Sequence, residues 1–187
     1  MSRYLIRPAG PRDAEPIARL HIASYRTAYR DVLPAGFLAG LTLADRERRW
    51  RASLRDPARS TFLTLMDNAA PRPVAFAETG VSRDGDATAA RTAELIALHV
   101  AEDCWHQGVG RALHAHAIRA LRDSGFADAT LWVLTGNERA RGFYAAMGWT
   151  PDGHARDLVV NGACIPEIRY RIGLAADARA AAVPPRG

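Results

Sequence analysis

Short stretches in which apolar and polar residues alternate predict the β-strands of this chain. Alternation places one face of a strand against a core and the other toward solvent, and a short, almost wholly apolar run indicates a strand buried on both faces. Turn-forming residues such as glycine, proline and asparagine separate these stretches. The predicted strands are Arg3–Pro8, Thr61–Met66, Pro73–Val81, Glu94–Val100 and Ala129–Leu134.

Apolar residues recur at helical spacing in four other stretches. In the first of them, Pro11 and Asp13 suit the opening turn of a helix. In the last, Asn137 is a good N-cap residue and Gly148 ends the helix. The predicted helices are Pro11–Tyr29, a second helix that carries Leu43, Trp50 and Leu54 on one face, Gly110–Gly125 and Asn137–Gly148.

The last part of the chain adds a β-hairpin and a tail. Asn161-Gly162 is typical of a two-residue hairpin turn, and a strand follows it through Tyr170. Because no linker or internal repeat divides residues 1–174, we expect one mixed α/β (α+β) domain with a mostly antiparallel sheet. Residues 175–187 are rich in Ala, Arg and Pro without periodicity, so we expect a disordered tail.

The composition excludes several classes of protein. The chain has 187 residues, 48% of them hydrophobic, which predicts a full-sized core rather than intrinsic disorder. No apolar run approaches the roughly 20 residues that span a bilayer, and the first residues lack the apolar segment of a signal peptide. The two cysteines, Cys104 and Cys164, suit a reducing compartment. We therefore expect a cytoplasmic protein with no membrane partner.

The net charge adds little to this picture. The 25 basic residues, all of them arginine, outnumber the 20 acidic ones and give a net charge of +5. The arginines are spread along the chain among acidic residues, so we expect no nucleic-acid partner. A modest preference for anionic ligands is what the charge supports.

A glycine-containing turn between a buried strand and a helix is the most informative part of the sequence. It runs Gln107-Gly108-Val109-Gly110-Arg111-Ala112. Glycines let the backbone approach an anion closely, and the free N–H groups at a helix N-terminus bind phosphate. A dinucleotide-binding motif is excluded because Leu113 stands where it requires glycine, and no G-K-[ST] follows as a P-loop requires. The turn therefore predicts a phosphate site of a third type.

The turn and a later segment together resemble the GCN5-related N-acetyltransferase (GNAT) superfamily. The family's pyrophosphate signature, Q/R-x-x-G-x-G/A, matches Gln107-x-x-Gly110-x-Ala112, and its second motif matches Asn137 followed by Phe143-Tyr144. The resemblance covers nearly all of residues 3–174. It implies the GNAT fold, in which a mostly antiparallel sheet with a splayed central strand pair is flanked by the predicted helices. It also implies acetyl-CoA as the co-substrate, a primary amine as the acceptor and no metal.

The resemblance assigns residues to the binding of acetyl-CoA. The end of the Glu94–Val100 strand would pair with the pantetheine arm, and an N–H there could serve as an oxyanion hole. The amides of the turn would hold the pyrophosphate. Asn137 has two compatible roles, as N-cap and as a cofactor contact. The cofactor-binding residues implied are Leu98, His99, Val100, Gln107, Gly108, Val109, Gly110, Arg111, Ala112 and Asn137.

Two residues are predicted to be catalytic. Tyr144 corresponds to the family's usual general acid, because a phenol stays protonated at neutral pH yet can donate a proton to a thiolate. The alternative is that Tyr144 packs beside Phe143 on an amphipathic helix. Glu94 is the predicted base, since it lies 13 residues before Gln107, the interval found in histone-acetylating members. The alternative there is a chain of water molecules.

The acceptor is the least determined part of the prediction. Tyr25 and Tyr29 are predicted to line the amine pocket, which leaves small molecules, amino acids and peptide or protein amines open. A homodimer is expected from family habit alone. Two other functions stay open: a non-catalytic acyl-CoA-binding sensor or interaction module on the same fold, and a nucleotide-binding protein that uses the same turn.

Overall fold

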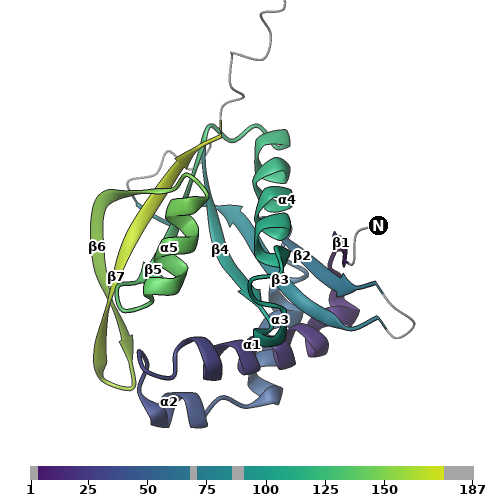
Figure 1. Ribbon diagram of the computed structural model, residues 1–187, viewed down its shortest axis with the longest axis vertical. Helices are drawn as coiled ribbons and strands as arrows, with labels where there is room; N and C mark the ends of the chain where they lie inside the picture. The colour runs from purple at the N-terminus through teal and green to yellow at the C-terminus, as the bar shows by residue number, and fades with distance from the viewer. Residues whose placement is uncertain (1–3, 68–70, 86–90, 175–187) are drawn as a thin grey trace, which may run out of the picture.

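The computed structural model describes residues 4–67, 71–85 and 91–174, and these form one seven-stranded sheet with helices on both of its faces (Figure 1). The strands lie in the order β1-β2-β3-β4-β5-β7-β6. They are β1 (Tyr4–Pro8), β2 (Arg59–Met66), β3 (Pro73–Val81), β4 (Thr92–Val100), β5 (Asp128–Leu134), β6 (Thr150–Val160) and β7 (Ala163–Gly173). The helices are α1 (Ala14–Ala28), α2 (Ala35–Ala39), α3 (Leu43–Ser53), α4 (Val109–Asp123) and α5 (Glu138–Ala146), with 3-10 turns at Pro11–Asp13 and Glu102–Cys104.

The sheet divides where β4 meets β5. Neighbouring strands elsewhere pair antiparallel, whereas β4 and β5 are parallel and pair only from Thr92 to Glu94 on β4. Directly after that point β4 carries a β-bulge, because Leu95 and Ala97 pair with consecutive residues of β3 and leave Ile96 unpaired. A bulge bends its strand and increases the local twist. The two strands therefore diverge toward the C-terminal end of β4, as Figure 1 shows.

Alternating side chains of the β2–β3 pair fill a core on each face of the sheet. Phe62 lies opposite Ala77 and packs in the core with α4, whereas Leu63 lies opposite Phe76 and packs with α1 and α3. This alternation follows from the two-residue period of a strand. Helix α4 thus covers one face of the β1–β4 half, and α1 with α3 covers the other.

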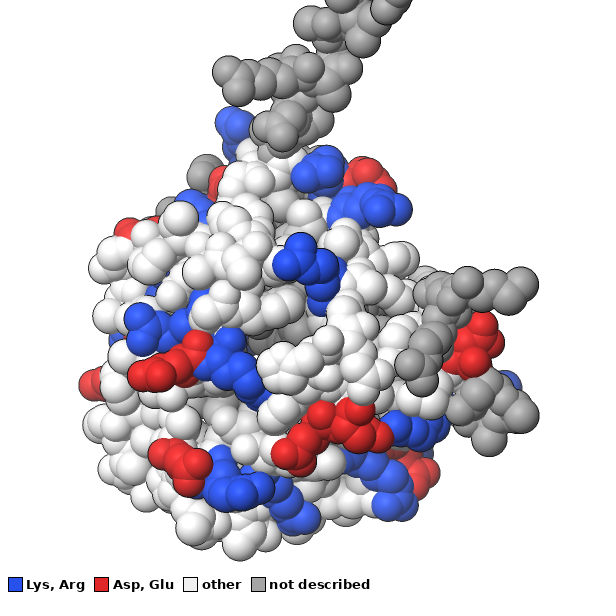
Figure 2. Space-filling view, in the orientation of Figure 1, with Lys and Arg blue, Asp and Glu red and all other residues white. Residues whose placement is uncertain are grey.

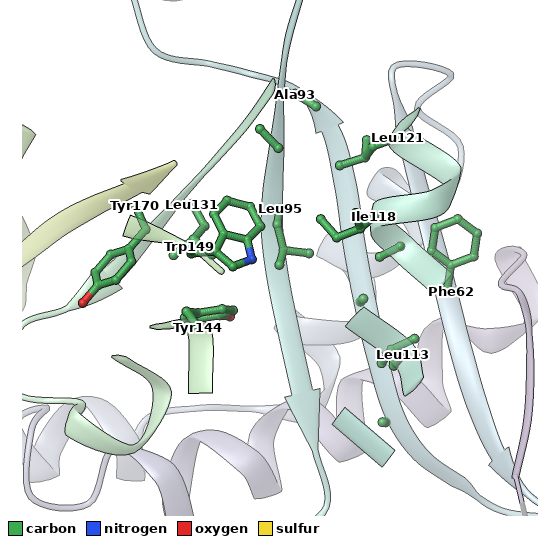
Figure 3. Close-up of a cluster of buried hydrophobic side chains, with 14 of the residues drawn as sticks. Phe62, Ala93, Leu95, Leu113, Ile118, Leu121, Leu131, Tyr144, Trp149 and Tyr170 are labelled. Carbon is green, nitrogen blue, oxygen red and sulfur yellow. The ribbon is translucent and has the colours of Figure 1, made fainter. Parts of the chain in front are cut away.

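A single apolar core joins the two halves of the sheet near the point of divergence. Figure 3 shows Tyr144, Trp149 and Tyr170 on the β5–β7 side facing Leu95 of β4, with side chains of α4 beyond it. A buried hydrogen bond adds to this contact, since Nε1 of Trp149 donates to Nε2 of His114 on α4 at 2.8 Å. The halves are therefore held together at one end and open at the other.

The predicted mixed, mostly antiparallel architecture is confirmed, and so is the hairpin turn. Asn161 and Gly162 both have positive φ angles, 49° and 80°, as a tight hairpin turn with two left-handed residues requires. One short helix and the first part of β6 were not predicted. Helix α2 is only five residues long, and β6 begins at Thr150, because an exposed edge strand can be polar and can contain Pro151 and Gly153. The predicted tail, residues 175–187, lies outside the described residues.

Candidate functional site

A cleft of about 1470 Å³ opens where β4 and β5 diverge. Its walls come from segments far apart in the sequence, including the ends of β4 and β5, the start of α4, one side of α5, helices α1 to α3 and the tip of the β6–β7 hairpin. The cleft is large enough for an extended cofactor together with a second small molecule. Most of the residues predicted from the sequence to act in binding or catalysis line it.

The N-terminus of α4 opens into this cleft without a side-chain cap. Within the described residues, the N–H groups of Gly108, Val109, Gly110 and Arg111 donate no hydrogen bond, and all four residues line the cleft. Gly108 has a φ of 80°, a left-handed conformation that glycine adopts without strain. The first turn of a helix presents unpaired donors and a partial positive charge. The arrangement is therefore suited to an anion such as a pyrophosphate.

The first and last residues of the predicted turn, Gln107 and Ala112, offer no unpaired donor to the cleft. The N–H of Ala112 donates to the carbonyl oxygen of Gly108 at 3.0 Å, so it is not among the unpaired donors. The side chain of Gln107 is held by two contacts of its own: Oε1 accepts from the Tyr4 hydroxyl, and Nε2 donates to the carbonyl oxygen of Asp103. Gln107 and Ala112 are both absent from the described lining of the cleft. Gln107 instead fastens the turn to β1.

The end of β4 forms the wall next to this turn. Leu98, His99 and Val100 all line the cleft, beyond the last residue at which β4 pairs with β5. The carbonyl oxygen of Val100 accepts a hydrogen bond from Nε1 of Trp105 at 2.9 Å. A Cβ atom placed on Gly110 would lie 3.4 Å from the Val100 side chain, so the start of α4 packs directly on the end of β4. The strand edge and the unpaired amides are thus adjacent.

Tyr144 lies on α5 with its ring between the two halves of the sheet (Figure 3). The ring packs against those of Phe143 and Trp149, at centroid distances of 5.4 and 6.1 Å. Within the described residues its hydroxyl makes no hydrogen bond, and the residue lines the cleft. Burial raises the pKa of the Tyr144 hydroxyl above its ordinary value. Packing and access to the cleft are both observed, so the two predicted roles are compatible.

Asn137 is the N-cap of α5, as predicted. Its Oδ1 accepts a hydrogen bond from the N–H of Ala140 at 3.1 Å. The side-chain nitrogen donates to no group within the described residues, and Asn137 lines the cleft although only 7% of it is exposed. That nitrogen is a donor available to a bound molecule.

Glu94 lies at the last residue pair of β4 and β5 and also lines the cleft. It is 2% exposed, and its carboxylate oxygens accept hydrogen bonds from the Arg83 guanidinium, one of them at 2.9 Å from Nε. The backbone N–H of Arg83 donates to the same carboxylate at 3.3 Å. A base role for Glu94 therefore requires that one oxygen be released from Arg83 or that a water molecule carry the proton.

Tyr25 of α1 and Tyr29, the C-cap residue of that helix, face the end of β4. Their ring centroids are 4.7 Å apart, and they lie 5.4 and 6.3 Å from that of His99. His21 adds a further ring 5.1 Å from His99, and its Nδ1 accepts a hydrogen bond from Trp50. Burial, with the charges of Arg139 and Arg46, lowers the pKa of His99 to about 4, so this imidazole is neutral at pH 7. The predicted acceptor residues and the predicted cofactor strand thus form one aromatic pocket.

Sequence reasoning missed residues that reach the cleft only through long-range packing. The Arg139 guanidinium lies 3.4 Å from the ring centroid of Trp105, a cation–π contact that joins α5 to the turn after β4. On α3, Arg46 lies over the ring of Tyr25 at 5.5 Å. Glu167 of β7 lines the cleft from the opposite half of the sheet. No local motif marks these residues. The one sequence feature that could have pointed to the cation–π contact is Trp105, which lies next to the glycine turn.

Charged side chains are mixed in sign over the face shown in Figure 2, where arginines and acidic residues lie interspersed on a mostly uncharged surface. Among the described residues, no group of three or more His, Cys, Asp or Glu side chains is arranged to hold a metal ion. The described helices also include none that is both long enough and apolar enough to cross a membrane.

Comparison with known proteins decides which fold family this is. The model of the acetyltransferase (GNAT) family matches residues 23–149, which include the β4 strand, the turn before α4, and Tyr144. The chain belongs to the GNAT family of acetyltransferases. The predicted family, fold and enzyme class are thereby confirmed, and the protein is an N-acetyltransferase of the GNAT type.

Individual relatives agree with this assignment. The chain is 30% identical over 155 residues to the uncharacterized N-acetyltransferase YuaI of Bacillus subtilis, covering 81% of this chain and 82% of that one. It is 26% identical to a probable N-acetyltransferase of Mycobacterium tuberculosis, over 91% of this chain and 94% of that one. The PaiA N-acetyltransferase of Thermoplasma acidophilum, solved in complex with coenzyme A, has the same fold. It matches with a TM-score of 0.67 and 17% identity, over 90% of this chain and 98% of that one.

Proposed function

We propose that the uncapped start of α4 holds the pyrophosphate of acetyl-CoA. The support is that four consecutive residues, 108–111, present unpaired N–H groups to the cleft at a helix N-terminus. Arg111, which is exposed beside them, adds a charge-assisted contact. Gln107 supports the turn through its bonds to Tyr4 and Asp103, and the amide of Ala112 closes the first helical bond.

The pantetheine arm would then run along Leu98, His99 and Val100. This part of β4 has lost β5 as a partner, so its backbone groups on that side are available to an extended ligand. A backbone N–H near the bulge at Ile96 would face the thioester carbonyl and stabilise the negative charge that develops there. The free side-chain nitrogen of Asn137 would add a contact from α5.

Tyr144 is proposed as the general acid of the reaction. Bound acetyl-CoA supplies the acetyl group as a thioester, and the acceptor amine forms the new C–N bond as the C–S bond breaks. The Tyr144 hydroxyl would give its proton to the departing sulfur and recover one from solvent. Burial keeps this hydroxyl protonated, and its lack of a hydrogen-bond partner among the described residues leaves it free to donate.

Glu94 is proposed to take the proton that the attacking amine loses. The carboxylate lies at the closed end of the cleft, where β4 and β5 separate, and Arg83 holds it in place. A water molecule between Glu94 and the amine would carry the proton without breaking the pair with Arg83. The acceptor amine itself would lie between the end of β4 and the rings of Tyr25 and Tyr29, at the end of α1.

The observation that carries this proposal is the cleft in which unpaired amides, a released strand edge and the Tyr144 hydroxyl lie together. The test is release of free thiol from acetyl-CoA in the presence of a panel of primary amines. Acetyl-CoA is also expected to raise the melting temperature through binding linkage, whereas ATP is not. Stabilisation by ATP without any effect of acetyl-CoA would favour the nucleotide-binding alternative. Stabilisation by acetyl-CoA without thiol release from any amine would favour the sensor alternative.

The wider setting of the enzyme is proposed from the sequence and the family. We expect a cytoplasmic enzyme that needs no metal and no nucleic acid and that forms a homodimer. Light scattering of the purified chain measures the oligomeric state, and dialysis against a chelator, which should leave the rate of thiol release unchanged, tests the metal requirement.

A further inference from the structure

Two arginines of α3 face the acceptor end of the cleft without an acidic partner. Arg46 and Arg49 both line the cleft, and within the described residues neither makes a hydrogen bond or an ion pair. The other arginines within this helix differ in that respect, since Arg48 is paired with Asp45 and Arg51 with Glu47. Arg46 and Arg49 are three residues apart, so they share one face of the helix. They therefore present two positive charges without an ion-pair partner to the same space, although Asp45, which is paired with Arg48, lies near Arg46.

This face of α3 lies beside the aromatic pocket. The Arg46 guanidinium carbon is 5.5 Å from the centroid of the Tyr25 ring, and the Arg46 side chain is half-buried. Its charge also reaches the imidazoles of His21 and His99, whose pKa values are lowered mainly by burial and further by Arg46. Arg46 thus lies close to the proposed acceptor pocket formed by Tyr25, Tyr29 and His99.

Two other arginines around the pocket have acidic partners. Arg83 is paired with Glu94 and Arg156 with Glu167. Arg139 stacks on Trp105 at the other side of the pocket and makes no ion pair within the described residues. A buried or half-buried cation without a counter-ion is unfavourable, because it has lost part of its hydration. Burial accordingly lowers the pKa of Arg46 from its ordinary value. An anion bound to Arg46 and Arg49 would offset the hydration that the Arg46 guanidinium has lost.

We propose that Arg46, assisted by Arg49, binds an anionic group of the acceptor, so that the substrate is a small amine that also carries a carboxylate, phosphonate or sulfonate. The inference rests on the proposed acetyltransferase function and names its substrate class. The amine points toward Tyr144 and the end of β4, and the anionic group points toward α3. A guanidinium recognises these groups through charge-assisted hydrogen bonds, which are stronger than neutral ones.

The opposite wall of the pocket supports the orientation. Glu167 of β7 lines the cleft, and its charge raises the pKa values of Tyr25 and Tyr29, to which burial makes the largest contribution. The Tyr25 hydroxyl is thus influenced by two opposite charges, that of Glu167, which is paired with Arg156, and that of the Arg46 guanidinium. A substrate with an ammonium or amine at one end and an anion at the other matches this separation of charge.

The experiment compares matched acceptors by release of free thiol. β-Alanine carries a carboxylate, taurine a sulfonate and 2-aminoethylphosphonate a phosphonate. Propylamine and ethanolamine carry no anionic group. A second set pairs L-amino acids with their amides. In the wild-type protein, kcat/KM should be about 10- to 100-fold higher for anionic members than for their neutral partners. Arg46→Gln should abolish most of this preference, and Arg49→Gln, at a more exposed site, should reduce it less.

Arg51→Gln is the matched control, because it removes the same charge from the same helix at a position outside the cleft lining. It should keep the wild-type preference. Equal use of neutral and anionic amines by the wild-type protein, or an unchanged preference in Arg46→Gln, would overturn the proposal while leaving the transferase function intact. Acetyl-CoA affinity should be the same in all variants, which separates this site from the cofactor site.

A second measurement decides the case in which no amine is acetylated. The protein loaded with coenzyme A is titrated with N-acetyl-β-alanine and with N-acetylpropylamine, and the melting temperature is followed. Stabilisation by the anionic compound alone, lost in Arg46→Gln but kept in Arg51→Gln, would support the anion site although the transferase function had failed. Absence of any stabilisation, or its persistence in Arg46→Gln, would overturn the anion site as well.

Discussion

Replacing Tyr144 by Phe removes one oxygen atom from the cleft and changes little else. The ring keeps its contacts with Phe143 and Trp149, whose centroids lie 5.4 and 6.1 Å away. The hydroxyl makes no hydrogen bond within the described residues, so its removal leaves no donor or acceptor without a partner there. The free energy of unfolding should therefore change by less than about 1 kcal/mol.

The effect on catalysis should be far larger than the effect on stability. A positioned general acid contributes about 10²- to 10⁴-fold to a rate, which corresponds to roughly 3–5 kcal/mol of barrier. Because the proton is transferred only as the sulfur departs, the loss should be in kcat, with KM for acetyl-CoA within about twofold of wild type. Burial raises the pKa of Tyr144 above its ordinary value of 10.0, so the wild-type acid stays protonated throughout the neutral range.

Thiol release under saturating acetyl-CoA measures this prediction, with melting temperature as the check on folding. Tyr170→Phe is the matched control, because Tyr170 is buried in the same core but does not line the cleft. That variant should retain wild-type kcat. If Tyr144→Phe keeps more than about half of the wild-type kcat, or loses no more than Tyr170→Phe, the acid role is refuted and packing alone explains the residue.

Three further predictions follow from other parts of the site. Glu94→Gln should lower kcat and remove the acidic limb of its pH profile; an intact acidic limb would point to a different base, such as a chain of water molecules. Arg111→Gln should weaken acetyl-CoA binding about 10-fold in calorimetry, whereas Arg119→Gln on the exposed side of α4 should not; equal affinities would remove Arg111 from the site. Burial lowers the folded-state pKa of His114 from 6.5 to about 4, so the unfolded chain binds a proton that the folded one excludes, and stability should fall as the pH drops from 6.5 to 4. His114→Gln still offers an acceptor to Trp149 but cannot titrate, so its free energy of unfolding should fall less over this pH range, by at most about 3 kcal/mol less in urea unfolding. An identical fall in both proteins would show that His114 is not the residue responsible.

The sequence could predict those features of the site that local geometry determines. The turn at Gly108 needs a left-handed residue and precedes a helix, and both facts are visible in the residues themselves. The N-cap at Asn137 is likewise a local interaction with the third residue after it. Tyr144 was predicted only through resemblance to the family, because a tyrosine beside Phe143 on an amphipathic helix is ordinary core packing.

Features that depend on distant pairing could not be predicted. Trp105 and Arg139 are 34 residues apart, and nothing near either of them indicates that the two side chains stack. The same holds for Arg46, whose stretch of arginines is typical of a solvated helix face until α1 places Tyr25 next to it. The start of β6 escaped prediction because an exposed edge strand needs no apolar face.

The site depends most on the divergence of β4 from β5. Neither strand's sequence indicates that the two strands diverge. Apart from His99, the residues of β4 that follow Glu94 are apolar like those of a central strand with two neighbours. Nevertheless β5 pairs with β4 at only three residues, and with β7 along its whole length. The bulge at Ile96 turns β4 away, and Tyr144 with Trp149 fills the space at the closed end. Beyond that point β4 has an unpaired, half-buried edge along the cleft, where backbone groups without partners are costly if water is excluded. An extended ligand that pairs with this edge completes the sheet, which is why the fold is suited to a cofactor with a long amide-containing arm.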